Sequence, residues 1–123
     1  MTQSSSTAAP YDPLSVEALA QRLAAAEAEA GAVQLIDVRE PAEIELASLP
    51  GFVNLPLSEF AAWSGTIHSR FECDRETIVL CHHGMRSAQM CGWLAQQGFS
   101  QLKNVTGGID AYALMVDRSV PRY

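Results

Sequence analysis

Short β-branched runs alternate with stretches of helical periodicity along this 123-residue chain. Residues 33–38 form a short β-branched run, which predicts a buried strand, and residues 77–80 and 102–105 predict two further strands. Residues 13–30 and 87–97 carry apolar side chains at helical spacing, and a glycine follows each stretch as a stop signal. Such alternation favours an α/β fold, with a central, mostly parallel sheet and helices on both faces in three α/β/α layers.

The remaining segments predict shorter elements. We expect Ser15 to cap the first long helix, a strand at residues 52–55, short helices at 41–47 and 57–63, and a last helix at 109–116. A loop is expected after residue 63 and through Glu76. Hydrophobic residues make up 48% of the chain and charged residues 18%, which suits one packed core. We therefore expect a flexible tail at residues 1–12 and a single domain at residues 13–123.

The formal net charge of −6 argues against nucleic acid as a partner, because binding phosphates needs a basic face. No run approaches the roughly 20 apolar residues that span a bilayer, and the first ten residues lack the apolar run of a secretory signal. Three cysteines are too few, and odd in number, for a disulfide framework. These features predict a cytoplasmic protein without membrane contact, and we expect a monomer.

The segment from Cys81 to Ser87 (CHHGMRS) carries the chemistry that can be read from the sequence. A cysteine ends a predicted strand, a short loop follows, and a helix begins near Ser87. Loop N–H groups and a helix N-terminus can converge there into an anion cradle. A thiol in such a cradle loses its proton more readily, because the same field stabilises the thiolate.

Two residues of this loop have specific expected roles. Gly84 lets the chain turn where a side chain would clash, and Arg86 supplies a fixed positive charge suited to sulfonate oxygens. Cys81 is therefore the predicted nucleophile. The predicted substrate- and anion-binding loop comprises His82, His83, Gly84, Met85, Arg86 and Ser87.

The loop resembles the active-site loop of the rhodanese family, with cysteine first and arginine sixth. Three further segments resemble family segments and occur in the family's order. They are LIDVRE at 35–40, LPGFVNLP at 49–56 and GGIDAY at 107–112. The resemblance spans residues 33–116 and implies a single-domain thiosulfate sulfurtransferase of the rhodanese-like fold.

The family resemblance implies a mechanism without metal or organic cofactor. A small anionic donor such as thiosulfate passes its outer sulfur to Cys81, and cyanide or a thiol removes it from the resulting persulfide. Asp37 and Arg39 are expected to have supporting roles. The sequence departs from the family pattern at Ala47-Ser48, where Gly-His is common, and at Tyr112, where Trp is common.

The other candidate ligands and thiols have simpler interpretations. Cys91 is expected in the core of a helix and Cys73 in a polar loop, where it is incidental. His82 and His83 adjoin Cys81, but neighbouring ligands in one tight loop rarely complete a tetrahedral metal site. We expect these histidines to line the pocket and to tune the thiolate.

Three alternatives remain open. A phosphatase or arsenate reductase on the same scaffold would also use a cysteine loop ending in arginine, but such loops resemble a pattern one residue longer than the one here. A non-catalytic module would be expected to lack the cysteine. A persulfide relay to a protein partner would need the same Cys81 chemistry, so the sequence does not separate it from small-molecule turnover.

Overall fold

The computed structural model describes residues 10–28 and 31–123, which form a parallel five-stranded sheet. The strands follow the order β1-β5-β4-β2-β3, and each pairs with its neighbour in parallel. Their bounds are β1 Asp12–Leu14, β2 Val33–Asp37, β3 Val53–Asn54, β4 Glu76–Leu80 and β5 Leu102–Val105.

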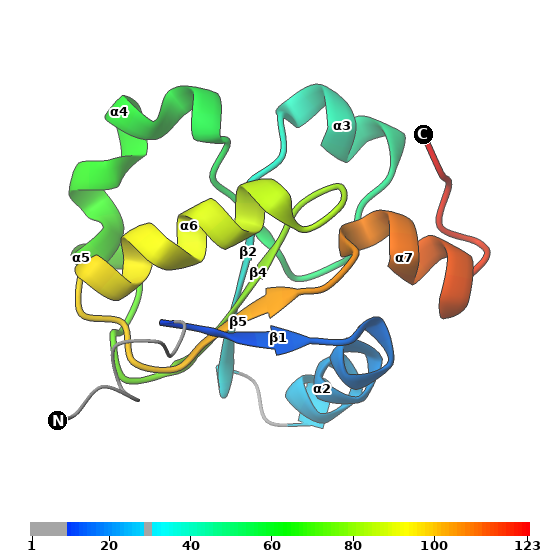
Figure 1. Ribbon diagram of the computed structural model, residues 1–123, viewed down its shortest axis with the longest axis horizontal. Coiled ribbons are helices and arrows are strands. Elements are labelled where there is room, and N and C mark those ends of the chain that lie inside the picture. The colour runs from blue at the N-terminus through cyan, green and yellow to red at the C-terminus, as the bar shows by residue number, and fades with distance from the viewer. Residues whose placement is uncertain (1–9, 29–30) are drawn as a thin grey trace, which may run out of the picture.

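Helices cover both faces of this sheet (Figure 1). The helix bounds are α2 Val16–Ala28, α3 Pro41–Leu46, α4 Phe60–Trp63, α5 Ile67–Arg70, α6 Met85–Gln96 and α7 Gly108–Met115, with short 3₁₀ turns at Leu57–Glu59 and Ser64–Thr66. The helices α2 and α7 lie on one face, and α4, α5 and α6 lie on the other. The expected three-layer α/β/α architecture is confirmed.

The core consists of two hydrophobic clusters, one on each face of the sheet. Alternation along β4 divides its side chains between them, because successive residues of a strand point to opposite faces. Ile78 and Leu80 pack with α2 and α7. Val79 packs with α4, α5 and α6, and Cys81, directly after the strand, belongs to the same cluster. The period of the strand therefore directs the Cys81 side chain toward α6.

The carboxyl ends of β2 and β4 lie side by side. Asp37 pairs with Leu80 in the sheet register, and the N–H of Val38 donates to the carbonyl oxygen of Leu80 at 3.0 Å. Parallel sheets bind ligands beyond this edge. Asp37 and Cys81 therefore lie at the same end of the sheet.

The sequence prediction missed structure near the N-terminus and in the segment before Glu76. Asp12–Leu14 forms the edge strand β1 beside β5, so part of the predicted tail and the predicted helix start at Pro13 are wrong; residues 1–9 lie outside the described part of the chain. The strand was missed because it is only three residues long and includes a proline, which an edge strand tolerates. The predicted loop before Glu76 contains α5, whose buried Ile67 contacts the core.

The predicted Ser15 cap of the first long helix is confirmed, because the Ser15 hydroxyl oxygen accepts the N–H of Ala18 at 3.1 Å. Within the described ranges, no helix combines the length and apolar character needed to cross a membrane.

Candidate active site

Cys81 is the first residue of the loop between β4 and α6. Its side chain is buried, with 1% of the residue exposed. The backbone N–H of Gly84 donates a hydrogen bond to its Sγ at 3.0 Å, and the Ser87 hydroxyl lies 3.2 Å from the same sulfur. Gly84 has a φ of 105°, which an L side chain rarely adopts, so glycine is what allows its amide to face the sulfur. Donors aimed at sulfur favour its negative form.

Fewer backbone donors face the Cys81 sulfur than the sequence predicted. Gly84 supplies the one backbone N–H found bonded to the sulfur among the described residues. The helix α6 begins at Met85 rather than at Ser87, and the side chain of Met85 points to solvent with 79% of the residue exposed. The Met85 side chain therefore lies outside the contacts that surround Cys81.

Asn104 orients the Ser87 hydroxyl beside Cys81. The Asn104 side-chain N–H donates to the Gly84 carbonyl at 3.1 Å, so its oxygen is left to accept from Ser87. A serine hydroxyl has one hydrogen. With that hydrogen directed to Asn104, the thiol S–H donates to Ser87; when the sulfur is a thiolate, the hydroxyl can turn its hydrogen toward the sulfur instead.

The N-terminus of α7 holds the backbone of the cysteine loop. The N–H groups of Ile109 and Asp110 donate to the carbonyl oxygens of Cys81 and His82, at 2.9 and 3.1 Å. Gly108 lies at a φ of 62°, and a Cβ there would stand 2.3 Å from the His82 carbonyl oxygen. Only glycine permits this close approach, which gives a physical reason for the Gly107-Gly108 pair.

Arg86 does not stand free over the sulfur. Its guanidinium donates two hydrogen bonds to Glu43 on α3, at 2.7 and 2.9 Å. The hydrogen bonds from Arg86 are the main cause that lowers the pKa of Glu43 to about 2. The hydrogen bonds to Glu43 likewise raise the pKa of Arg86, and the Cys81 sulfur adds to this shift. The positive charge predicted at Arg86 is therefore present but paired with a carboxylate.

Asp37 and Arg39 form a buried ion pair beneath α3. The Arg39 side chain is fully buried and donates to the Asp37 carboxylate at 2.8 to 3.2 Å. It also donates to the carbonyl oxygens of Ala47 and Glu43 and to the Tyr123 hydroxyl. Arg39 thus fixes α3, the helix that presents Glu43, and neither partner makes a hydrogen bond to Cys81 among the described contacts.

His82 lies between two other rings. Its ring stacks on His83 and on Tyr123, with centroid separations of 3.9 Å in both pairs and interplanar angles of 28° and 8°. Burial lowers the pKa of His82, so the ring is neutral at neutral pH. Its Nε2 is buried without a hydrogen-bond partner among the described residues.

His82, His83 and Asp110 offer ligand atoms within 4.8 Å of one another, but their geometry does not suit a metal ion. A metal lies close to the plane of each imidazole that binds it, and two nearly parallel stacked rings do not direct their nitrogens to one point. Asp110 is in addition engaged by Arg122 at 2.9 Å. These three residues instead form one side of the region around the cysteine loop.

The other two thiols take no part in this arrangement. Cys91 is fully buried in α6, and burial raises its pKa to about 12. Cys73 lies half-buried near the end of α6, with its Sγ 3.7 Å from the Gln97 carbonyl oxygen.

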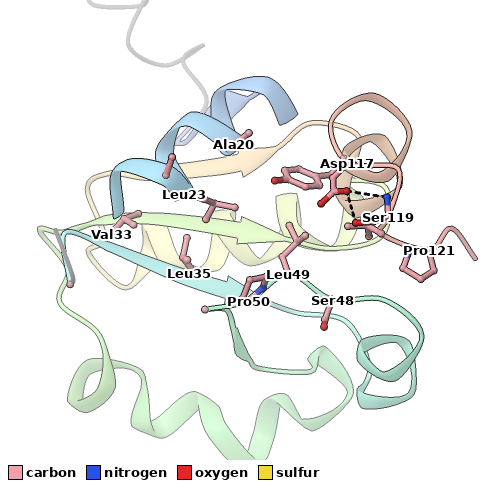
Figure 2. A pocket seen from close by; sticks show the side chains of 15 residues that line it. Ala20, Leu23, Val33, Leu35, Ser48, Leu49, Pro50, Asp117, Ser119 and Pro121 are labelled. Carbon is pink, nitrogen blue, oxygen red and sulfur yellow. Dashed lines mark hydrogen bonds between the residues drawn. The ribbon is translucent and has the colours of Figure 1, made fainter. Parts of the chain in front are cut away.

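A separate cleft of about 790 Å³ opens on the face of the sheet that carries α2 and α7. Figure 2 shows Leu23, Leu35 and Leu49 around it, with Asp117 bonded to Ser119 at its rim. None of residues 81–87 lines this cleft. The residues that carry chemistry lie elsewhere, so the cleft is not the candidate active site.

Residues 19–115 match the profile of the Rhodanese-like domain. The chain belongs to the rhodanese-like domain family. A sulfurtransferase of Allochromatium vinosum is 38% identical over 97 residues, which cover 79% of this chain and 83% of that protein. The Arabidopsis thaliana rhodanese-like/PpiC domain-containing protein 12, chloroplastic, is 54% identical over 90 residues, or 73% of this chain, but the match spans only 30% of its length.

A solved structure of a rhodanese-related protein has a similar fold. The crystal structure of a rhodanese-related protein from Thermoplasma volcanium superposes with a TM-score of 0.68 at 28% identity. The match covers 86% of this chain and 94% of that one.

Sequence reasoning missed four residues of this rhodanese-like domain that shape the site. Glu43, Asn54, Asn104 and Tyr123 were not assigned roles. Asn54 donates its side-chain N–H groups to the carbonyl oxygens of Asp37 and Arg39, at 2.9 and 2.8 Å. It belongs to the segment LPGFVNLP at 49–56, whose resemblance to the family could have indicated a role. No local signal marks Tyr123, because its partners are distant in the chain.

Proposed function

We propose that this protein is a sulfurtransferase that carries a sulfane sulfur on Cys81 as a persulfide. The observation that carries the proposal is the 3.0 Å hydrogen bond from the Gly84 N–H to the Cys81 sulfur. A donor aimed at the sulfur from a strand-to-helix loop stabilises a thiolate and, after transfer, the charge on a persulfide. Membership of the rhodanese-like family supports the same reaction class.

The proposed transfer has two balanced steps. In the first, the Cys81 thiolate attacks the outer sulfur of thiosulfate, the S–S bond breaks, and sulfite leaves with the bonding electron pair. A persulfide anion remains on Cys81. In the second, cyanide attacks the outer persulfide sulfur, thiocyanate leaves, and the thiolate is restored; a thiol acceptor works in the same way and keeps the sulfur in a new persulfide.

The structure favours sulfur transfer over phosphate chemistry at this loop. Four residues separate Cys81 from Arg86, and one backbone amide in the described structure is bonded to the sulfur. Cysteine loops that act on phosphate resemble a pattern one residue longer, whose additional backbone donor helps to stabilise a phosphoryl transition state. The guanidinium of Arg86 is in addition engaged twice by Glu43.

The test is thiocyanate formation from a sulfane donor and cyanide, compared across three proteins. We expect the wild type and Cys91→Ser to produce thiocyanate and Cys81→Ser to produce none. Cys91 is the matched control because burial raises its pKa to about 12, so its thiolate is scarce at neutral pH. Thiocyanate from Cys81→Ser, or efficient turnover of an aryl phosphate by the wild type, would contradict the proposal.

A further inference from the structure

The charges around the cysteine loop are arranged in pairs. Arg86 is bound to Glu43, Arg39 to Asp37, and Arg122 to Asp110. These ion pairs surround the loop, because Asp110 also lies 3.8 Å from His83 and Arg39 is bonded to Tyr123, which stacks on His82. Each of these three guanidinium groups has its charge opposed by a carboxylate.

Glu43 is the carboxylate that lies against the loop arginine. Arg86 donates to both of its oxygens, Tyr123 donates to Oε1 at 2.9 Å, and the N–H of Glu40 donates to Oε2 at 3.0 Å. With its pKa lowered to about 2 by Arg86, this carboxylate is ionised at neutral pH. It cancels the charge that the loop arginine would otherwise offer to an anion.

The net charge of the chain also disfavours a dianion. The whole chain carries a formal charge of −6, which opposes the approach of anions. Burial lowers the pKa of His82, so this ring adds no positive charge at neutral pH. A donor with two negative charges is disfavoured here more than a donor with one.

We propose that Glu43 is a specificity-determining residue that makes this site prefer singly charged sulfane-sulfur donors over doubly charged thiosulfate. The inference rests on the proposed sulfur transfer to Cys81 and names the donor class that this site accepts. Methanethiosulfonate is a suitable monoanionic probe. The Cys81 thiolate attacks its outer sulfur, the S–S bond breaks, and methanesulfinate leaves where thiosulfate would release sulfite.

The two donors differ in charge, while the bond that forms and the bond that breaks are the same. Comparing their kcat/KM values therefore tests the effect of donor charge. Coulomb energy is proportional to the charge of the ligand. When the opposing charge of Glu43 is removed, the free energy gained from the charge of Arg86 is therefore twice as large for the dianion as for the monoanion. The fold-gain for thiosulfate should be the square of the fold-gain for methanethiosulfonate.

The experiment measures kcat/KM for both donors in the wild type, Glu43→Gln and Glu45→Gln. Glutamine keeps an oxygen for the Glu40 N–H and for Arg86 but removes the charge. We expect Glu43→Gln to raise kcat/KM by about tenfold for thiosulfate and about threefold for methanethiosulfonate. Glu45→Gln, the matched control, removes an exposed charge on the same helix and should change neither value.

The outcomes separate this inference from the proposed function. Equal changes for the two donors, or a loss with thiosulfate, would show that Glu43 only positions Arg86 and would overturn the specificity role. Absence of sulfur transfer from either donor, in every variant, would overturn the proposed function together with this inference.

A second measurement needs only the wild type and is independent of the folding of any variant. Neutral salt weakens the attraction between a cationic site and an anion. We expect kcat/KM for thiosulfate to stay level or rise as potassium chloride is increased. A steep fall would mean that the charge of Arg86 is open to the donor, which contradicts the proposal.

Discussion

The backbone N–H of Ile109 donates a hydrogen bond to the carbonyl oxygen of Cys81 across 2.9 Å. The start of α7 thereby holds the backbone of the proposed nucleophile, although the two residues are far apart in the chain. Gly108 makes the contact possible, because its missing side chain leaves room for the carbonyl oxygens of Cys81 and His82.

Gly108→Ala should therefore damage both the fold and the site. A Cβ there would lie 2.3 and 2.5 Å from two carbonyl oxygens at a φ of 62°, so the loop must move. We expect a loss of about 3 kcal/mol in the free energy of unfolding, measured in urea. The control is Gly92→Ala in α6, where a Cβ meets nothing within 4 Å; it should be neutral or gain about 0.5 kcal/mol. Equal stability of the two variants would contradict this account of Gly108.

Arg86→Ala should weaken transfer from thiosulfate. Removing the guanidinium leaves the carboxylate of Glu43 without its partner beside the loop, and a bare carboxylate repels the dianion. We expect kcat/KM for thiosulfate to fall about tenfold. Arg70→Ala removes an exposed arginine from α5 and serves as the comparison; a similar fall in both variants would indicate only an effect of net charge.

Asp37→Asn should be costly because it leaves the buried guanidinium of Arg39 without its counter-charge. Breaking a buried pair from one side destabilises by about 3 kcal/mol or more. Equilibrium unfolding in urea measures the loss. Glu72→Gln removes one partner of the exposed Arg75 pair and should cost less than about 0.5 kcal/mol. If the two variants lost the same small amount, the Asp37–Arg39 pair would not have the stabilising role assigned to it.

The pH dependence of stability should report on Glu43. The pKa of this residue is lowered from an ordinary 4.5 to about 2, mainly by the hydrogen bonds from Arg86. A lowered pKa in the folded state stabilises the protein above pH 4.5, and that stabilisation is lost as the pH falls toward 2. The free energy of unfolding of the wild type should therefore fall more steeply through this window than that of Glu43→Gln. Parallel curves would show that the Glu43–Arg86 pair contributes nothing.

The sequence was informative where structure is local. The strand segments at β2, β4 and β5 and the Ser15 cap could be predicted, because strand patterns and helix caps depend on a few neighbouring residues. The three-residue β1 was missed, because its pairing with β5 is a tertiary contact. The helix α5 was missed because its four residues are too few to show a helical period.

The residues of the site likewise fall into those that a local motif could predict and those that it could not. Cys81 and Gly84 could be identified from the loop itself, and the structure places their sulfur and N–H in contact. The partner of Arg86 could not, because Glu43 reaches it from 43 residues away. The ring of Tyr123 likewise meets His82 only through the fold. Charge pairing across elements decides whether an arginine is available to a substrate, and a local motif does not record it.

The most direct test of the central claim is the mass of the intact protein after incubation with a sulfane donor and removal of excess reagent. The account predicts a gain of one sulfur atom on the wild type, loss of that gain after cyanide is added, and no gain for Cys81→Ser. A sulfur adduct that persists in Cys81→Ser, or an unchanged wild-type mass with both thiosulfate and methanethiosulfonate, would contradict it.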